Sequence, residues 1–423
     1  IVGREWWWVI LFLIPTVGFI VWIIVALDLA KAFGRGTGFG IGLIFPVMPD
    51  LIEDVTGGSL SQAALWGGIL TAAFALMQFL FGPIMGNLSD RYGRRPILLA
   101  SLAIMALDYL VMAVAGTLWL LFAGRLVAGI SAATHSTATA FMADISPPDQ
   151  RAKNFGFIGA AFGVGFVAGP LLGGLLAEID TRAPFWAAAI LAAANLVLGW
   201  FVLPETVTDE NRRAFSWARA NPLSSFKAIG HLPGLGRYLA LHFVYTVAFY
   251  VYPTVWSYYG IARFGWDPFM IGFSLALFGL ALAAVQATAV APSIRRWGER
   301  RTAIYGAWID VVAFAVYGFV TSGFWALVFT PVAALSGVVG PALQGLMTNA
   351  TPNDQQGELQ GVLTSLTAVA MGISPVIMTG IFSFFTAPGA PVYSPGAPFL
   401  LSALLMFVCI AILSVKPRRP QPA

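Results

Sequence analysis

Ionisable residues inside apolar stretches are the residues of this sequence that could do chemistry. Asp108 lies in MALDYLVM, Arg125 in LLFAGRLVAG and Asp310 in GAWIDVVAF. A charge in such surroundings is costly, so it faces a cavity, pairs with an opposite charge or carries a proton. Asp310 is the only carboxylate in the apolar segments of the second half, and low dielectric favours its protonated form. We therefore predict that Asp310 carries protons, the alternative being an acid that is hydrogen-bonded for packing only.

Arg125 needs a counter-charge if its segment crosses a membrane. Asp108, on the preceding apolar segment, is the nearest candidate. The pair could line a functional cavity or simply hold two helices together, and the sequence leaves both interpretations open.

Composition shows what kind of protein positions these residues. Of 423 residues, 58% are hydrophobic and 10% are charged, and the mean hydropathy is +0.81. A soluble domain carries about 25% charged residues, whereas apolar runs of ~20 residues are typical of membrane-spanning helices. The alternating pattern of a membrane β-barrel is absent from the sequence. We therefore expect an all-α membrane protein with apolar segments at 6–27, 39–52, 63–85, 97–115, 118–143, 156–177, 184–203, 237–260, 269–292, 302–322, 324–349, 359–385 and 398–415.

Basic residues alternate between the loops. Of 23 Lys and Arg, 17 lie in loops on one side, which the positive-inside rule places in the cytoplasm together with the linker 204–236 and the C-terminus. The net charge of +4 is dispersed over short loops, which favours a topological role and argues against nucleic-acid binding. A single cysteine, Cys409, allows no disulfide within the chain.

The chain repeats itself at a fixed offset. Gly93 in DRYGRRPILL matches Gly298 in RRWGERRTAI, Asp149 matches Asp354, and Pro170 matches Pro375, each pair 205 residues apart. Paired repeats of this kind are common in membrane transporters. We predict an atypical N-terminal segment 1–36, six-helix bundles at 37–203 and 237–415 joined by the linker 204–236, and a cytoplasmic tail 416–423.

The loop GNLSDRYGRRPILL concentrates four charges, Asp90, Arg91, Arg94 and Arg95, between two apolar runs. Its glycines allow helix ends to approach, and Asp90 can cap a helix or pair with an arginine. Such a contact could be made in one conformational state and broken in another. The alternative is a basic loop that only sets topology.

A second motif combines glycines with a proline. Gly165, Gly169 and Gly173 recur at a spacing of four, with Pro170 and Gly174 beside them. Small residues at this spacing make a smooth helix face that permits close helix packing, and Pro170 weakens the helix locally. The alternative is generic small-residue packing.

Together these motifs resemble those of the major facilitator superfamily. The amino-acid sequence of residues 40–415 is similar to that of its tetracycline-type drug:proton antiporters. The resemblance implies proton coupling for Asp310 with Asp108, and cavity positions for Arg125, Gln78 and Gln286. It implies a gating set formed by Asp90, Arg91, Arg94, Arg95, Asp144 and Arg151. It also implies that Gly165, Gly169, Pro170, Gly173 and Gly174 form the motif associated with export.

Two regions depart from that family. Leu282 stands where the family often has a histidine, and Thr37 where it has an acid. Residues 1–45 instead look like small uncharacterised bacterial membrane proteins, which suggests a fused or replaced N-terminus joined at GIGLIF. Either 6–27 is an extra span before a shortened first helix at 37–54, or the first helix is distorted.

The resemblance implies proton-coupled export of an amphipathic, tetracycline-like drug across a bacterial inner membrane by alternating access. It implies a functional monomer in the lipid bilayer with protons and a small molecule as partners, no nucleic acid and no cofactor, although the substrate can arrive as a divalent-metal chelate. The sequence shows no nucleophile–base set, metal-ligand cluster or nucleotide loop, so we expect no enzyme. The alternatives are a same-fold transporter of another metabolite and a non-transporting scaffold.

Aromatic residues crowd the run HFVYTVAFYVYPTVWSYYG at 242–260. They could line a pocket for a flat substrate, or they could face lipid at the membrane interface.

Overall fold

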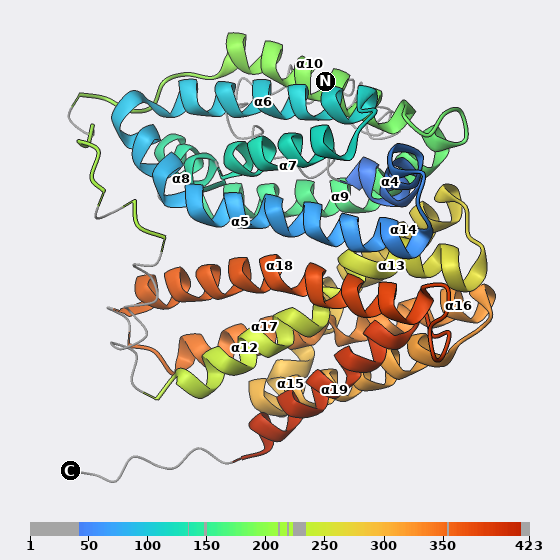
Figure 1. Cartoon of the computed structure of the whole chain (residues 1–423). Helices are drawn as coiled ribbons and strands as arrows, with labels where there is room; N and C mark the ends of the chain where they lie inside the picture. The colour runs from blue at the N-terminus through green and yellow to red at the C-terminus, as the bar shows by residue number, and fades with distance from the viewer. Residues whose placement is uncertain are drawn as a thin grey trace, which may run out of the picture. The chain divides into compact units, whose positions relative to one another are not determined.

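The computed structural model describes residues 42–415 apart from 134, 148–149, 210–211, 218–219, 223–233 and 353–354. Every regular element among these residues is a helix, which confirms the all-α expectation (Figure 1). The alternatives for residues 1–36, the tail 416–423 and the anchors Asp149 and Asp354 lie outside the described residues.

The chain forms two compact units. Unit 1 comprises Ile1–Gly57, Ala73–Pro222 and Asp267–Ala276, and unit 2 comprises Gly58–Ala72, Leu223–Trp266 and Leu277–Ala423. Two long helices therefore contribute residues to both units. The functional division at the linker 204–236 stays a prediction.

The first half places a short helical segment before its long helices. The expected apolar segment 39–52 contains no long helix among its described residues; its helix α4 ends at Gly57, whose left-handed backbone (φ 62°) suits glycine. The side chain of Thr117 caps α7 by accepting a hydrogen bond from the Leu120 amide. The elements are η2 (Phe45–Val47), α4 (Met48–Thr56), α5 (Leu60–Tyr92), α6 (Arg94–Val114), α7 (Leu118–Ala132), α8 (His135–Ile145), α9 (Arg151–Ala177) and α10 (Ala183–Val202).

The second half contains helices that are interrupted within their apolar segments. The segment expected at 237–260 divides at Tyr250, and the one expected at 324–349 contains a 3-10 turn. The elements are α12 (Gly236–Phe249), α13 (Val251–Phe264), α14 (Pro268–Thr288), α15 (Val290–Phe319), α16 (Gly323–Ala334), η4 (Leu335–Val338), α17 (Val339–Asn349), α18 (Gln356–Thr386) and α19 (Ala397–Ser414).

Helix boundaries repeat at the offset predicted from the sequence. Helix α7 begins at Leu118 and α16 at Gly323, and α9 begins at Arg151 and α18 at Gln356, each pair 205 residues apart. Gly93 before α6 and Gly298 inside α15 both have positive φ angles, 111° and 73°. The same backbone bend therefore recurs in both halves, which supports the internal duplication.

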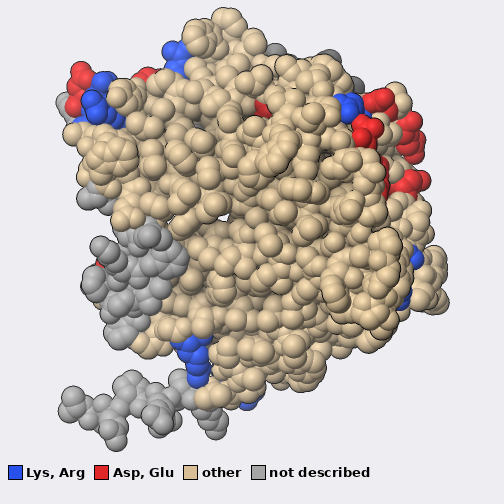
Figure 2. Space-filling view, viewed as in Figure 1, with Lys and Arg blue, Asp and Glu red and all other residues tan. Residues whose placement is uncertain are grey.

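Ten of the described helical segments are long and apolar enough to cross a membrane. Figure 2 shows charged side chains gathered at helix ends, with an almost uncharged surface between them. Such a surface is suited to lipid. The chain is a multi-pass membrane protein.

Candidate functional site

Asp108 and Arg125 form a buried ion pair in unit 1. Asp108 projects from α6 and Arg125 from α7, and the guanidinium Nη2 donates to the Asp108 Oδ2. Their side chains are 4% and 12% exposed. Arg125 also lies 5.5 Å from the centre of the Phe74 ring and 3.1 Å from the sulfur of Met112. The expected pairing is thus present, and it satisfies two charges that would be costly alone.

The two glutamines expected in a cavity differ in their surroundings. Gln78, in α5, donates through Nε2 to the carbonyl of Ala132 at 3.4 Å, which connects α5 to the end of α7. Gln286, near the end of α14, is exposed. Their roles in binding stay predictions.

Asp310 is the most deeply buried acid of unit 2. It lies in α15 and is 1% exposed, and no described Lys, Arg or His pairs with its carboxylate. The Ser336 hydroxyl of η4 lies beside it, and Tyr245 of α12 and Cys409 of α19 are also near. Whether Asp310 carries protons or is an acid held by hydrogen bonds for packing stays open, since the Ser336 hydroxyl lies within reach of its carboxyl. A carboxylate so placed is far cheaper to bury when neutral.

Leu282 occupies the position where the resembled family often has a histidine. Its side chain packs on Gly337, where an added Cβ would lie 2.3 Å from the Leu282 Cδ1. Gly337 follows Ser336, so an apolar side chain lies next to the turn that faces Asp310. His242, elsewhere in unit 2, hydrogen-bonds Thr367 at 3.0 Å through its Nε2.

The aromatic run at 242–260 builds an internal core in unit 2. Tyr252, Trp256 and Tyr259 are between 0% and 8% exposed, and they pack on one another and on Phe399 at centroid distances of 4.9 to 6.2 Å. These three side chains do not face lipid. The Tyr252 hydroxyl is a further buried polar atom without a partner in the described part of the chain.

The gating set is only partly brought together. Arg94 bridges two carboxylates, with Nη1 at 2.8 Å from Asp90 and Nε at 2.7 Å from Asp144. Arg91 is exposed and lies over its neighbour Tyr92. The side chain of Arg151 lies outside the described residues.

Glu205 is a member of this cluster that the sequence did not indicate. Its carboxylate accepts from the backbone amides of Arg94 at 2.9 Å and Arg95 at 3.3 Å, and so caps the start of α6. The same carboxylate also accepts from the amides of Thr206 and Val207. Its location 111 residues after Arg94 gives no local signal that could reveal the contact.

The glycine and proline motif of α9 permits very close backbone packing in unit 1. A Cβ on Gly173 would lie 2.0 Å from the Leu43 carbonyl oxygen, and one on Gly174 would lie 2.5 Å from that of Pro268. A Cβ on Gly42 would lie within 3.1 Å of atoms of Gly165, Gly169 and Pro170. The smooth face expected from the spacing is therefore used for packing, and α9 continues through Pro170. Its association with export stays a prediction.

Helix α4 carries acids outside the candidate spans. Asp54 pairs with Arg182 at 2.7 Å, and Arg182 also donates to the carbonyls of Ala113 and Ala115 at the end of α6. Burial, and then the nearby charge of Glu53, raise the pKa of Asp50 to about 6. Burial also raises the pKa of Glu53.

Comparison with known families identifies this arrangement. The family model of the Major Facilitator Superfamily matches residues 32–375 and 238–423. The chain belongs to the Major Facilitator Superfamily. This is a superfamily of transporters, so the expectation that the chain is not an enzyme is confirmed.

Relatives place the chain within one branch of that superfamily. It is 40% identical to the class C tetracycline resistance protein of Escherichia coli, over 88% of this chain and 92% of the relative. It is 39% identical to the class G tetracycline resistance protein of Vibrio anguillarum, over 90% and 94%. The crystal structure of the human organic anion transporter MFSD10 matches with a TM-score of 0.66 and 25% identity, over 91% of this chain and 98% of that chain. The expected resemblance to tetracycline-type transporters is therefore confirmed.

The N-terminus has a second match. Residues 1–48 match the model of a family of unknown function, and this match overlaps the superfamily match over 32–48. The overlap contains GIGLIF at 40–45, where the sequence suggested a junction.

Proposed function

We propose that this protein exports a tetracycline-like drug across a bacterial inner membrane in exchange for protons, with the central linker and C-terminus in the cytoplasm. The substrate class rests on the names of relatives that are about 40% identical over about nine-tenths of the chain. The direction rests on the resistance function in those names, because resistance by a transporter requires removal of the drug.

The observation that carries the coupling mechanism is the buried carboxyl of Asp310, which has no counter-charge among the described residues. In the absence of a counter-charge, the neutral form is favoured while the site is dry, and entry of water favours release of the proton. Alternating access supplies this change, because a site open to one side is wet and a closed site is dry. Proton uptake on one side and release on the other then couple the gradient to drug movement.

Asp108 has a different part in this proposal. Its carboxylate is engaged by Arg125, so the pair holds the guanidinium in place. Release of Asp108 from that pair would be needed before it could carry a proton. We therefore assign proton transfer first to Asp310, and to Asp108 the positioning of Arg125 in the drug pathway with Gln78 and Gln286.

The test uses inverted membrane vesicles that contain the protein, with tetracycline and Mg²⁺, and an imposed proton gradient. Wild type should accumulate drug, and Asp310→Asn should lose gradient-driven accumulation while it still exchanges labelled for unlabelled drug. Asp209→Asn is the matched control, since Asp209 is an exposed acid of the linker. Removal of Mg²⁺ with a chelator tests whether the drug travels as a metal chelate.

Each result separates substrate from mechanism. Accumulation by Asp310→Asn at the wild-type rate would exclude Asp310 as the coupling group. Proton release driven by other drugs but not by tetracycline would support the proton-coupled mechanism and would exclude tetracycline as the substrate. Absence of any transport by wild type, with the protein folded in the membrane, would favour the scaffold alternative.

A further inference from the structure

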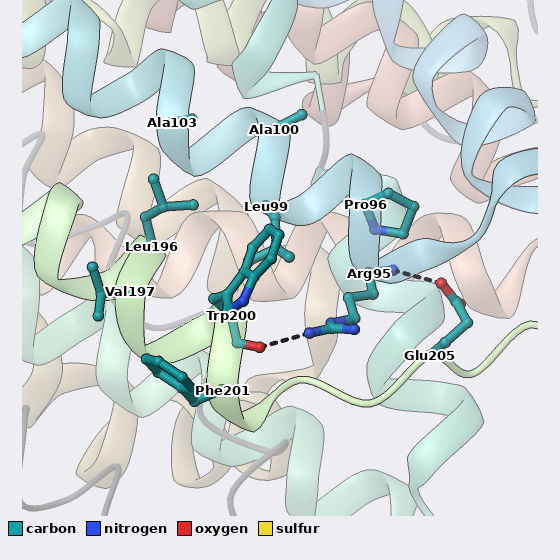
Figure 3. Close-up of a pocket in the computed structure, with 10 residues that line it drawn as sticks. All are labelled: Arg95, Pro96, Leu99, Ala100, Ala103, Leu196, Val197, Trp200, Phe201 and Glu205. Atoms are coloured by element: carbon teal, nitrogen blue, oxygen red, sulfur yellow. Dashed lines mark hydrogen bonds between the residues drawn. The ribbon is translucent and has the colours of Figure 1, made fainter.

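A groove on the outside of unit 1 runs between α6 and α10 (Figure 3). It has a volume of about 800 Å³, and eight of its ten lining residues are apolar. Its floor includes Leu99 and Leu196, which belong to the core between these helices. Ala100 and Ala103 are exposed, and their small side chains leave space along one wall of the groove. The groove is lined by residues of two candidate spans, α6 and α10, and by Glu205 after α10.

Two charged residues lie at one end of the groove. The Nη2 of Arg95 donates to the Trp200 carbonyl at 2.6 Å, and its guanidinium lies 5.7 Å from the centre of the Trp200 ring. The Nε of Arg95 is buried and has no hydrogen-bond partner in the described part of the chain. Glu205, at the same end, is exposed beyond its contacts with backbone amides. Figure 3 shows the Arg95 side chain pointing toward Trp200, with Glu205 on the other side of Arg95.

The location of the groove indicates contact with lipid. Arg95 lies in the first turn of α6 and Trp200 in the last turn of α10, both at span ends. Val197, Trp200 and Phe201 are 55%, 61% and 80% exposed in a protein that crosses a membrane. Tryptophan and arginine at this depth are typical of the membrane interface, where each has an apolar part in the chains and a polar part among head groups.

We propose that this groove binds one phospholipid with an ethanolamine head group. The phosphate pairs with the guanidinium of Arg95, whose fork of donors matches phosphate oxygens. One acyl chain lies along Ala100 and Ala103. The primary ammonium of the head group donates to Glu205, so the two opposite charges of the site meet the two opposite charges of the lipid.

Charge complementarity is what favours this lipid over others. An anionic lipid without an ammonium would satisfy Arg95 but would face the carboxylate of Glu205. A choline head group has no N–H and cannot donate a hydrogen bond. The lipid would also join α6, α10 and the cap of α6, because Glu205 already holds the amides of Arg94 and Arg95.

The experiment measures lipid binding to purified, delipidated protein by native mass spectrometry. Phosphatidylethanolamine, phosphatidylglycerol and phosphatidylcholine with identical chains are added in turn, with glycerophosphoethanolamine as a head group without chains. We expect one saturable site that prefers phosphatidylethanolamine, and no binding of the chain-free head group. Arg95→Gln should weaken that site about tenfold or more.

A groove-filling variant keeps the test independent of Arg95, whose loss also removes the contact to Trp200. Ala103→Phe should weaken phosphatidylethanolamine binding about tenfold. Ala193→Phe is the matched control, because Ala193 is an exposed alanine of α10 outside the groove lining, and it should bind like wild type. Glu205→Gln should remove the preference over phosphatidylglycerol.

Two results would overturn the proposal. Equal lipid binding by Ala103→Phe and Ala193→Phe would place the lipid elsewhere. A wild-type site with the same affinity for all three head groups would reject the ethanolamine assignment and remove Glu205 from the site.

Discussion

The two halves of the molecule each bury an acid, and they treat it in opposite ways. In unit 1, Asp108 is paired with Arg125. In unit 2, Asp310 is equally buried and has no counter-charge among the described residues. A paired carboxylate keeps its charge and holds its partner in place, whereas an unpaired one changes its charge whenever its surroundings become wet or dry. The two halves thus have similar helices, but their buried acids differ in whether an opposite charge is paired with them.

The same divergence occurs in the loops that contain the repeat. Arg94 pairs with Asp144 at 2.7 Å in the first half. The positions 205 residues later hold Glu299 and Asn349, joined by an Asn–Glu hydrogen bond of 3.0 Å. Both halves therefore have a side-chain contact between the corresponding positions, but the two pairs of residues carry different charges. The first-half contact is an ion bridge and the second-half contact is only a hydrogen bond.

Removing the acid of the paired site is the change expected to have the largest effect on stability. Asp108→Asn leaves the Arg125 charge buried without compensation, which costs about 3–5 kcal/mol. The melting temperature in detergent, followed by tryptophan fluorescence, should fall steeply and folded yield should drop.

The double variant Asp108→Asn with Arg125→Gln is the control for that effect. It removes both charges, so most of the lost stability should return. If the single and double variants melt together, the pair contributes no electrostatic stabilisation and the contrast with Asp310 fails.

The corresponding change in unit 2 should have the opposite sign. Asp310→Asn replaces a carboxyl that has no counter-charge among the described residues with a neutral amide of the same shape, so the free energy of unfolding should stay the same or rise by about 1 kcal/mol. The melting temperature at pH 8, where the acid is most readily ionised, is the measurement. A loss as large as that of Asp108→Asn would mean that Asp310 has a partner in the membrane.

The charged loop contact should have a smaller effect. Arg94→Gln breaks contacts to Asp90 and Asp144 at a partly exposed position, and we expect a loss of about 1 kcal/mol. Glu299→Gln leaves the hydrogen bond to Asn349 possible and should cost less. Melting temperatures at low and high salt separate the two, since only the Arg94 contribution is screened by salt.

An exchange variant sharpens the comparison of the loops. Glu299→Arg with Asn349→Asp installs the first-half charges in the second half. If the two loops hold the corresponding side chains in the same arrangement, this double variant should be more stable than either single variant. Its stability should also become sensitive to salt. Equal stability of all three would show that the two loops are not equivalent in geometry.

Much of this organisation could be predicted from the sequence, because it depends on features that recur or are costly. Apolar runs of sufficient length indicated the helices, and three anchors at one offset indicated the duplication, since a duplicated framework keeps its bends. Charges inside apolar runs indicated Asp108, Arg125 and Asp310. The family matches confirm the superfamily and its branch.

Other features depend on contacts between distant segments and have no local pattern. Glu205 looks like an ordinary linker acid, and only the fold brings it to the start of α6. The aromatic run suggested a pocket or a lipid face, but three of its rings, Tyr252, Trp256 and Tyr259, pack into a core. That no counter-charge reaches Asp310 from any described residue is likewise a property of several helices together.

The smallest effect is expected at α4, where Asp50 offers a third kind of acid, one that is partly buried outside the spans. Burial, and then the charge of Glu53, raise its pKa in the folded protein to about 6, from the usual value of 3.8. The folded state therefore binds this proton more tightly than the unfolded state does. The resulting stability is fully present below pH 3.8 and is lost as pH rises through about 6.

Asp50→Asn removes this dependence. Relative to wild type, the variant should become progressively more stable as pH rises from 4.5 to 7.5, by no more than about 1 kcal/mol because the group is partly exposed. The difference in melting temperature between the two proteins, measured across that range, is the test. Glu53→Gln should produce a weaker change in the same direction, since it removes the smaller of the two causes. A difference that is constant with pH would show that Asp50 is as well solvated in the folded protein as in the unfolded chain, and would leave Asp108 and Asp310 as the acids whose burial matters.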